Sequence, residues 1–253
     1  MATRGIGGAP VSWVALFGAI LGATSIIPAI FWFEGGGYIA MNRLLLPLVG
    51  LVLGPYAGAV AGLVGGIIGL LIAPASLTGG IPDLIMLYVV PPLAAGWISK
   101  SKTVLPALVL GATGLVARQI FPYYWPGPSA GFQTPTEPYW TYSFWFIILA
   151  VIVLITPLGW KYIPAWLRSD DIKRRTLGLV FVYWLASIGA SYGWSMAWEG
   201  YFFRWPTELA AFIPIAAIPL EHTFASVASG LIASPIIGAL RKSGLRKIPN
   251  AIW

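Results

Sequence analysis

The chain has 253 residues, of which 58% are hydrophobic and 9% are charged, and its formal net charge is +7. This composition is too apolar for an ordinary soluble domain and indicates an integral membrane protein. The sequence contains no cysteine and one histidine. It therefore excludes disulfides, thiolate catalysis, iron–sulfur clusters, cysteine-ligated zinc and a bis-histidine haem within the chain.

Eight apolar segments follow one another along the chain, and most approach the roughly 20 residues that a helix needs to cross a bilayer core. They lie at about 11–33, 43–54, 55–73, 82–99, 103–122, 142–165, 174–198 and 208–240. The first lacks a cleavage-site pattern and is interpreted as a membrane helix rather than a signal peptide. The sequence thus predicts an all-α polytopic membrane bundle of about 7–8 transmembrane segments in a single domain over residues 1–253.

Two of these segments have unusual lengths. The second is short and meets the third at Gly54-Pro55, a pair that breaks helices. We expect a tight hairpin whose first leg does not fully cross the membrane and which packs inside the bundle. The last segment exceeds the membrane thickness and contains Pro214, Pro219 and Pro235, so it is expected to tilt, kink or begin outside the bilayer.

Positive charge is concentrated in alternate gaps between the apolar segments. Of the 15 Lys and Arg residues, the gaps interpreted as cytoplasmic hold Arg4, Lys100, Lys102, Lys161, Arg168, Lys173, Arg174, Arg175, Arg241, Lys242, Arg246 and Lys247. The opposite gaps hold Arg43 and Arg204, and Arg118 lies within a segment. The positive-inside rule then predicts cytoplasmic N- and C-termini in a multi-pass protein of the plasma membrane. Anionic membrane lipid accounts for the basic rim without a nucleic-acid partner.

The outward gaps are rich in aromatic residues, which favour the boundary between water and lipid. An ordinary aromatic belt is one interpretation, and a set of rings around a binding site is the other. The longest outward loop runs from Tyr123 to Thr141 and carries four prolines. It suits either a lid over an outward cavity or a plain surface connection.

Small residues recur at four-residue spacing in two segments. The first segment carries Ala15, Ala19 and Ala23 on one face, and the third carries glycines at the same spacing, at positions 58, 62 and 66. Faces without bulky side chains let helix backbones approach closely in lipid. Each stripe therefore predicts either internal packing or docking of a partner chain.

A family resemblance involves residues 42–73, NRLLLPLVGLVLGPYAGAVAGLVGGIIGLLIA. A short helix, a Leu-Gly-Pro turn and a glycine-rich helix in this order resemble the second and third helices of the substrate-binding S components of energy-coupling factor transporters. The alanine stripe in the first helix, and a last helix that opens on Glu-His and closes on Leu-Arg-Lys, are similar as well. The resemblance implies that Ala15, Ala19 and Ala23 dock on a transmembrane coupling subunit.

The similarity covers residues 1–122 and 207–241, whereas the pair of segments at about 142–200 looks like an insertion, since S components usually have six helices. The resemblance implies uptake of a small nutrient powered by partner ATPase subunits. The chain itself has no G-x-x-x-x-G-K-[ST] phosphate loop, so ATP-driven work requires another chain.

Binding is favoured over catalysis. The sequence has no H-E-x-x-H or G-x-S-x-G motif, and its eight acidic residues are scattered. No nucleophile and base stand at a spacing that indicates an active site. We therefore expect a protein that is not an enzyme and that carries no cofactor or metal, and an intramembrane enzyme acting on lipid is the weaker alternative.

Glu221 and His222 follow Pro219 inside the last apolar segment, where an ionised carboxylate facing lipid is costly. They are expected to face the bundle, as ligands for substrate or proton or as a structural pair that bonds backbone carbonyls freed by proline. Arg118, beside Gln119, is expected either to neutralise Glu221 or a substrate carboxylate, or to extend to the outer interface.

Glu34 and Glu199 each follow an aromatic residue and precede glycine at the outer ends of two segments. The predicted substrate-binding residues are Glu34, Asn42, Arg118, Gln119, Glu199, Glu221 and His222. The favoured function is capture of a small, vitamin-like nutrient at the outer side, with aromatic walls and few polar groups. The alternative is an accessory subunit of a larger membrane complex with no substrate of its own.

Overall fold

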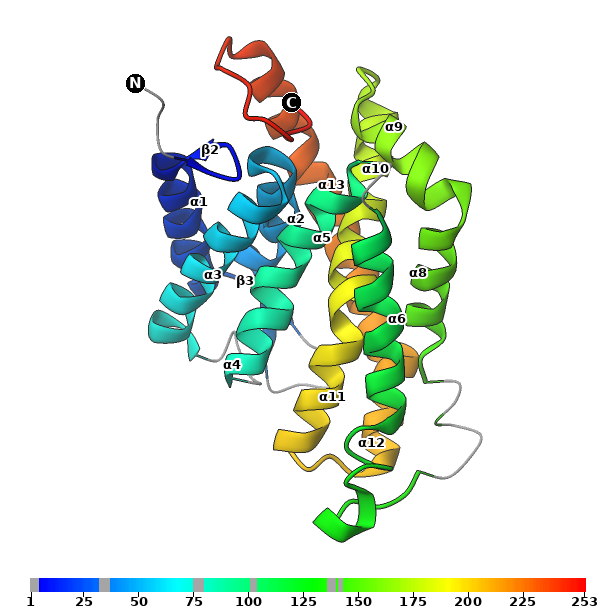
Figure 1. The fold of residues 1–253 in the computed structure, drawn as a ribbon. Helices are drawn as coiled ribbons and strands as arrows, with labels where there is room; N and C mark the ends of the chain where they lie inside the picture. The colour runs from blue at the N-terminus through cyan, green and yellow to red at the C-terminus, as the bar shows by residue number, and fades with distance from the viewer. Residues whose placement is uncertain (1–4, 32–36, 75–79, 101–103, 136–139, 141–142) are drawn as a thin grey trace.

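The computed structural model describes residues 5–31, 37–74, 80–100, 104–135, 140 and 143–253. In this part of the chain the protein is a bundle of helices with two very short β-hairpins (Figure 1). Both chain termini lie at one end of the bundle, and the connection between α11 and α12 lies at the other. Helices α1 and α3 form one flank, and α8 and α9 form the opposite flank.

The N-terminal region contains both hairpins. Strands β1 (Gly5–Ile6) and β2 (Ala9–Pro10) pair in antiparallel fashion and lead into α1 (Val11–Ala23). After a 3-10 turn η1 (Thr24–Ile26), β3 (Pro28–Phe31) pairs with β4 (Tyr38–Ala40). The chain is mostly helical as expected, but the helix predicted over residues 11–33 ends early, because the apolar run from Pro28 to Phe31 forms a strand. Residues 32 and 33 lie outside the described residues.

The helical hairpin at Gly54 is present as predicted. Helix α2 (Met41–Leu53) ends at Gly54, whose φ of 84° suits a residue without Cβ, and α3 (Pro55–Ile72) begins with proline in its first turn. Nearly all of α2 is buried, including Pro47 and the run from Leu48 to Leu53. The short α2 therefore packs inside the bundle, as irregular membrane segments must.

The middle of the chain forms three further helical regions. Their bounds are α4 (Gly80–Asp83), η3 (Leu84–Val89) and α5 (Val90–Ile98) in one continuous helix, α6 (Val104–Ile120), the 3-10 turn η5 (Gly127–Ala130), and α8 (Trp145–Ile155) followed by η6 (Leu158–Tyr162) and α9 (Ile163–Leu167). Here η3 and η6 are π-helical. The α8 and η6–α9 helices meet at a bend of 65°.

The C-terminal half consists of two long helices with π-helical interiors. The first comprises α10 (Ile172–Trp184), η7 (Leu185–Tyr192) and α11 (Gly193–Phe202). The second comprises α12 (Thr207–Phe212), η8 (Ile213–Ala217) and α13 (Ile218–Lys242), with Pro235 inside α13. The helix formed by α10, η7 and α11 runs through the middle of the bundle (Figure 1). In the sequence, the same residues belong to the pair of segments at about 142–200 that looks like an insertion.

Each predicted apolar segment falls on a helical region, but the lengths differ. Four helices in the described residues are long and apolar enough to cross a membrane, namely Pro55–Ile72, Gly80–Ile98, Ile172–Phe202 and Thr207–Lys242. The bent pair Trp145–Ile155 and Leu158–Leu167 makes a fifth if it is one span, while Val11–Ile26, Met41–Leu53 and Val104–Ile120 are shorter apolar helices. The protein is thus a helical bundle of the kind found in multi-pass membrane proteins.

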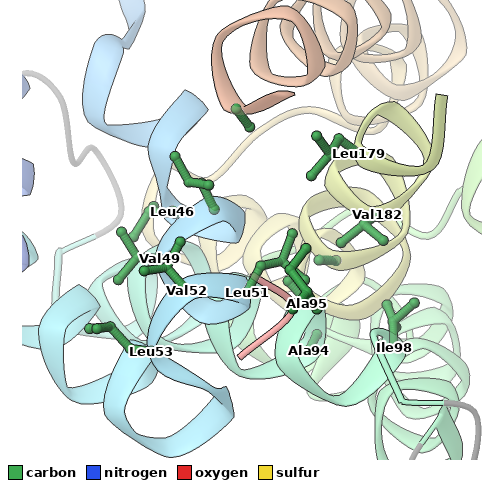
Figure 2. Packing of buried hydrophobic residues seen from close by; sticks show 14 of the residues in the cluster. Leu46, Val49, Leu51, Val52, Leu53, Ala94, Ala95, Ile98, Leu179 and Val182 are labelled. Carbon is green, nitrogen blue, oxygen red and sulfur yellow. The ribbon is translucent and has the colours of Figure 1, made fainter. Parts of the chain in front are cut away.

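Aliphatic side chains from α2, α5 and α10 meet in the largest core cluster. Figure 2 shows Leu46, Val49 and Leu51 of α2 near Ala95 of α5 and Val182 of α10. The approach is close because α2 presents Gly50 to α5. A Cβ at Gly50 would overlap the backbone carbonyl of Pro92. Small residues thus bring these helix backbones together, as expected in lipid.

The two small-residue stripes have different environments. Gly58 and Gly62 of α3 pack on α2 and on the carbonyl of Tyr88, so the glycine stripe serves internal packing. Gly18 and Gly22 of α1 pack on α3. The stripe formed by Ala15, Ala19 and Ala23 is instead exposed on the outer side of α1.

Basic residues gather at the end of the bundle that holds the termini. Arg241 donates hydrogen bonds to the carbonyls of Ser169 (3.0 Å) and Leu167 (2.9 Å), and Arg168 donates to Ser99 O (2.6 Å). The C-terminal tail folds back against this end, where the indole of Trp253 donates to Val52 O at the end of α2 (3.0 Å). These arginines and the tail satisfy carbonyls that helix ends leave open.

Candidate functional site

A cavity of about 240 Å³ lies among helices from both halves of the chain. Its wall is formed by Arg43, Leu87, Tyr192, Met196, Glu199, Phe203, Trp205, Ile213, Ile218 and Glu221. Phe203 and Trp205 belong to the α11–α12 connection, and this connection lies at the end of the bundle away from the termini (Figure 1). The two rings stack with centroids 6.0 Å apart. The cavity thus combines aromatic walls with a few ionisable groups, the usual composition of a small-molecule site.

Arg43 is the cation of the cavity wall. It stands in the first turn of α2, and it interacts electrostatically with Asp83 of α4 and with Tyr88, Tyr183 and Tyr192. The first turn of α2 reaches the cavity because the β3–β4 hairpin leads directly into this helix. Arg43 is half-buried, and its guanidinium carries a fixed positive charge that acidic neighbours stabilise.

Three carboxyl groups supply this negative charge. Ser195 donates a hydrogen bond to Asp83 Oδ1 (2.8 Å) and also lies 3.1 Å from Glu199 Oε1, and the Asp83 and Glu199 carboxyls hydrogen bond to each other. Asp83 and Ser195 are fully buried. The shared hydroxyl of Ser195 therefore links Asp83 of α4 to Glu199 of α11.

Glu221 is the third carboxyl, and it faces the bundle as predicted. Its side chain is 1% exposed and lines the cavity from the first turn of α13. His222 is also 1% exposed, and its ring meets that of Tyr192 edge to face at 4.6 Å. Within the described part of the chain, neither ring nitrogen of His222 has a hydrogen-bond partner. In this part of the chain His222 thus makes no hydrogen bond to a carbonyl freed by proline.

Asn42 lies next to Arg43 and is fully buried. Its amide nitrogen donates to the hydroxyl of Tyr88 (3.2 Å), while its amide oxygen has no donor among the described residues. Ser229 of α13 donates to Leu44 O in the next turn (2.7 Å). The start of α2 is thus held between η3 and α13 by side-chain hydrogen bonds, which fixes the position of Arg43.

Arg118 lies in a separate aromatic cage and does not reach the surface. Its guanidinium carbon is 4.4 Å from the ring centroid of Trp140, 5.0 Å from Phe144 and 5.3 Å from Tyr123. Nη2 donates to Ala210 O (2.9 Å). Its electrostatic neighbour among the acids is Glu199 rather than Glu221. Cation–π contacts of this kind stabilise a desolvated arginine.

The remaining candidates occupy less informative positions. Gln119 is half-buried, and its backbone carbonyl accepts a hydrogen bond from Trp140 Nε1 (3.4 Å). Glu34 lies outside the described residues. The structure thus brings Asn42, Glu199, Glu221 and His222 to one region and places Arg118 and Gln119 at a second, neighbouring one.

Sequence reasoning missed Arg43, Asp83, Ser195 and Tyr192. Arg43 was assigned to an outward gap and Asp83 to the outer end of the segment at about 82–99, and the structure places them in helical turns of α2 and α4, with Asp83 fully buried. The available signal was that both residues border an apolar segment, where an ionisable group marks a functional site by default.

Three π-helical segments contribute to the cavity wall. Leu87 belongs to η3, Tyr192 to η7 and Ile213 to η8. A π-helical turn inserts an extra residue into a helix and redirects the side chains around it, and such turns occur frequently at functional sites. Their convergence on one cavity marks it as the strongest candidate site in the described structure.

The site offers no metal-binding cluster, since no three His, Asp or Glu side chains of the described residues come together as metal ligands. Compared with known proteins, the chain matches no family model, no curated protein and no solved structure. The functional conclusion therefore depends on the geometry of this cavity and on the sequence.

Proposed function

We propose that the protein is a membrane-embedded subunit that binds a small molecule at the outer side of the plasma membrane. The observation that carries the proposal is the cavity itself, where aromatic rings and ionisable groups meet inside an apolar bundle. Ionisable residues within a membrane are costly to keep and are typical of substrate or ion sites. The π-helical segments at its wall give independent support.

The same proposal includes the topology expected from the charges. Eight membrane-embedded helical segments with cytoplasmic termini would place the basic end of the bundle inside, where anionic lipid attracts it. The cavity would then open outward, because its aromatic rim lies at the opposite end. Segments that are too short to cross alone, such as α2, are shielded by their neighbours.

We further propose that the subunit works in uptake together with partner chains, as an S component of an energy-coupling factor transporter does. Two features support this: the helical hairpin at Gly54 and the exposed stripe of Ala15, Ala19 and Ala23 on α1. An exposed stripe of small residues in lipid suits close contact with another helix. The competing function is an accessory subunit without a substrate of its own, since an exposed alanine stripe would dock a partner helix in either kind of protein.

Purification from native membranes tests this function. We expect the protein to retain partner membrane chains and a small molecule, both detectable by mass spectrometry. Ala19→Leu should release the partner chains while the subunit still folds, because an isobutyl group would separate the two backbones. Ala216→Leu, at an exposed alanine of η8 on another helix, is the matched control. Retention of partners by both variants would reject the stripe as the interface, and partners without any bound small molecule would favour the accessory subunit.

The topology predicts which positions are open to reagents outside the cell. The chain has no native cysteine, so any labelling with a maleimide comes from the single cysteine that is introduced. We expect Ser129→Cys, exposed within η5, to react with an impermeant maleimide on intact cells. Ser243→Cys, exposed after α13, should react only after the membrane is opened. Labelling of Ser243→Cys on intact cells would invert the proposed orientation.

A further inference from the structure

The wall of the cavity carries more acid than base. Glu199 and Glu221 line it together with Arg43, and Asp83 adds a third carboxyl behind Glu199. The fully buried Arg118 is not among the residues that line the cavity, and its guanidinium faces three aromatic rings. An anionic ligand would find one cation, Arg43, and two carboxyl groups, those of Glu199 and Glu221, at this wall. A negative charge is therefore disfavoured there.

The groups around the cavity are also rich in hydrogen-bond acceptors. The oxygen of Asn42 and both nitrogens of His222 are buried without a partner in the described part of the chain. Neutral histidine offers one acceptor nitrogen, and the amide oxygen offers two lone pairs. The single proton of the Ser195 hydroxyl serves only one of the two carboxyl oxygens near it at a time. The acceptors that do line the cavity are the carboxyl groups of Glu199 and Glu221, and a ligand that brings several N–H donors can bond both.

The size and walls of the cavity limit the rest of the ligand. About 240 Å³ is below the usual range of pockets for drug-sized molecules. The rings of Tyr192, Phe203 and Trp205 offer flat apolar surfaces to the same space. A cation next to such rings is stabilised by their negative faces, and the absence of a metal-ligand cluster among the described residues argues against a bare metal ion.

Resting on the proposed binding function, we infer that the ligand class is a small organic cation with one planar ring and several N–H donors, such as an amidine or a protonated heteroaromatic amine. Its charged nitrogen groups face Glu199 and Glu221, and its ring lies against Trp205 and Tyr192. When the cavity holds no cation, the positive charge of Arg43 offsets the negative charge of these carboxyl groups.

Three isosteric probes test the class: benzamidine, benzamide and benzoate, which share one shape and carry positive, zero and negative charge. Binding is measured by ligand-observed NMR on the full-length protein in nanodiscs of neutral phosphatidylcholine, with empty nanodiscs subtracted. We expect the Kd of benzamidine to be at least about tenfold below that of benzamide, and benzoate to be the weakest. Equal binding of benzamide or benzoate would overturn the cationic class while leaving a binding cavity in place.

Variants locate the binding. Glu221→Gln and Glu199→Gln should remove most of the preference for benzamidine, whereas Glu208→Gln, at an exposed acid of α12, should keep it. Trp205→Ala should weaken all three probes to a similar degree, because it removes the shared ring contact. Elution volume and thermal unfolding show whether each variant folds. Unchanged preference in both acid variants would overturn the inference, and no binding of any probe would overturn the proposed binding function with it.

Discussion

Gly62→Ala is expected to destabilise the protein strongly, although alanine is the better helix former. In an exposed helix this change favours folding by about 1 kcal/mol. At position 62, however, the added Cβ would overlap the backbone carbonyl of Tyr88 and lie 3.1 Å from Pro92 Cγ. Neither atom belongs to a flexible side chain, so α3 and the η3–α5 helix must move apart. Overpacking of this kind costs about 1–3 kcal/mol or more.

The matched control is Gly238→Ala in α13. There the new Cβ would meet only the end of the Arg175 side chain, at 3.1 Å from Nη2, and that end can shift. Thermal unfolding of both variants in the same detergent separates packing from helix propensity. We expect Gly62→Ala to lower the midpoint by about 5 °C or more and Gly238→Ala to leave it nearly unchanged. Equal stability of the two variants would mean that the helices are less tightly packed than the structure has them.

The helical segments could be predicted because their signal is local. Apolar runs with a break at Gly54-Pro55 placed α2 and α3 to within two residues at each end. The strand pair β3–β4 could not be found in the same way. The run after Pro28 is as apolar as a helix end, and a short apolar run does not distinguish a strand from a helix. Pairing with β4 decides between them, and pairing is a tertiary event.

Glu221 could be predicted to face the interior because exposing a carboxylate to lipid costs free energy, whatever the arrangement of the other helices. Its neighbours could not be predicted. Arg43 and Asp83 are 40 positions apart in the sequence, and their electrostatic interaction arises only in the folded chain. Arg118 illustrates the same limit, since its cage depends on where the rings of Tyr123, Trp140 and Phe144 lie relative to α6.

The glycine and alanine stripes show what spacing alone can and cannot tell. Both have the same four-residue period, and both allow close approach of a second helix. The helix that approaches the glycine stripe belongs to the same chain, whereas the alanine stripe on α1 is exposed. Periodicity thus identifies a contact face, and only the fold decides whether the chain itself fills it.

Arg43→Met is expected to cause the largest loss of stability among single changes at the site. Methionine keeps most of the volume of the side chain but removes the one cation of the cavity wall. Asp83 and Glu199 then remain without their shared positive neighbour. Removing one partner of a buried ionic group costs about 3–5 kcal/mol, because the other charge stays buried and uncompensated. Arg174→Met is the control, since the Arg174 side chain is 71% exposed and exposed pairs contribute little.

A double-mutant cycle with Asp83→Asn shows whether the loss is electrostatic. Once Asp83 is neutral, Arg43 has less negative charge to compensate, so the double variant should lose clearly less stability than the sum of the two single variants. The measurement is the unfolding midpoint of all four proteins in one detergent, with the hydroxyl of Ser195 left in place to bond the asparagine oxygen. Strictly additive losses would mean that Arg43 and Asp83 act independently. The electrostatic partner of Arg43 would then be Glu199 or Glu221 instead.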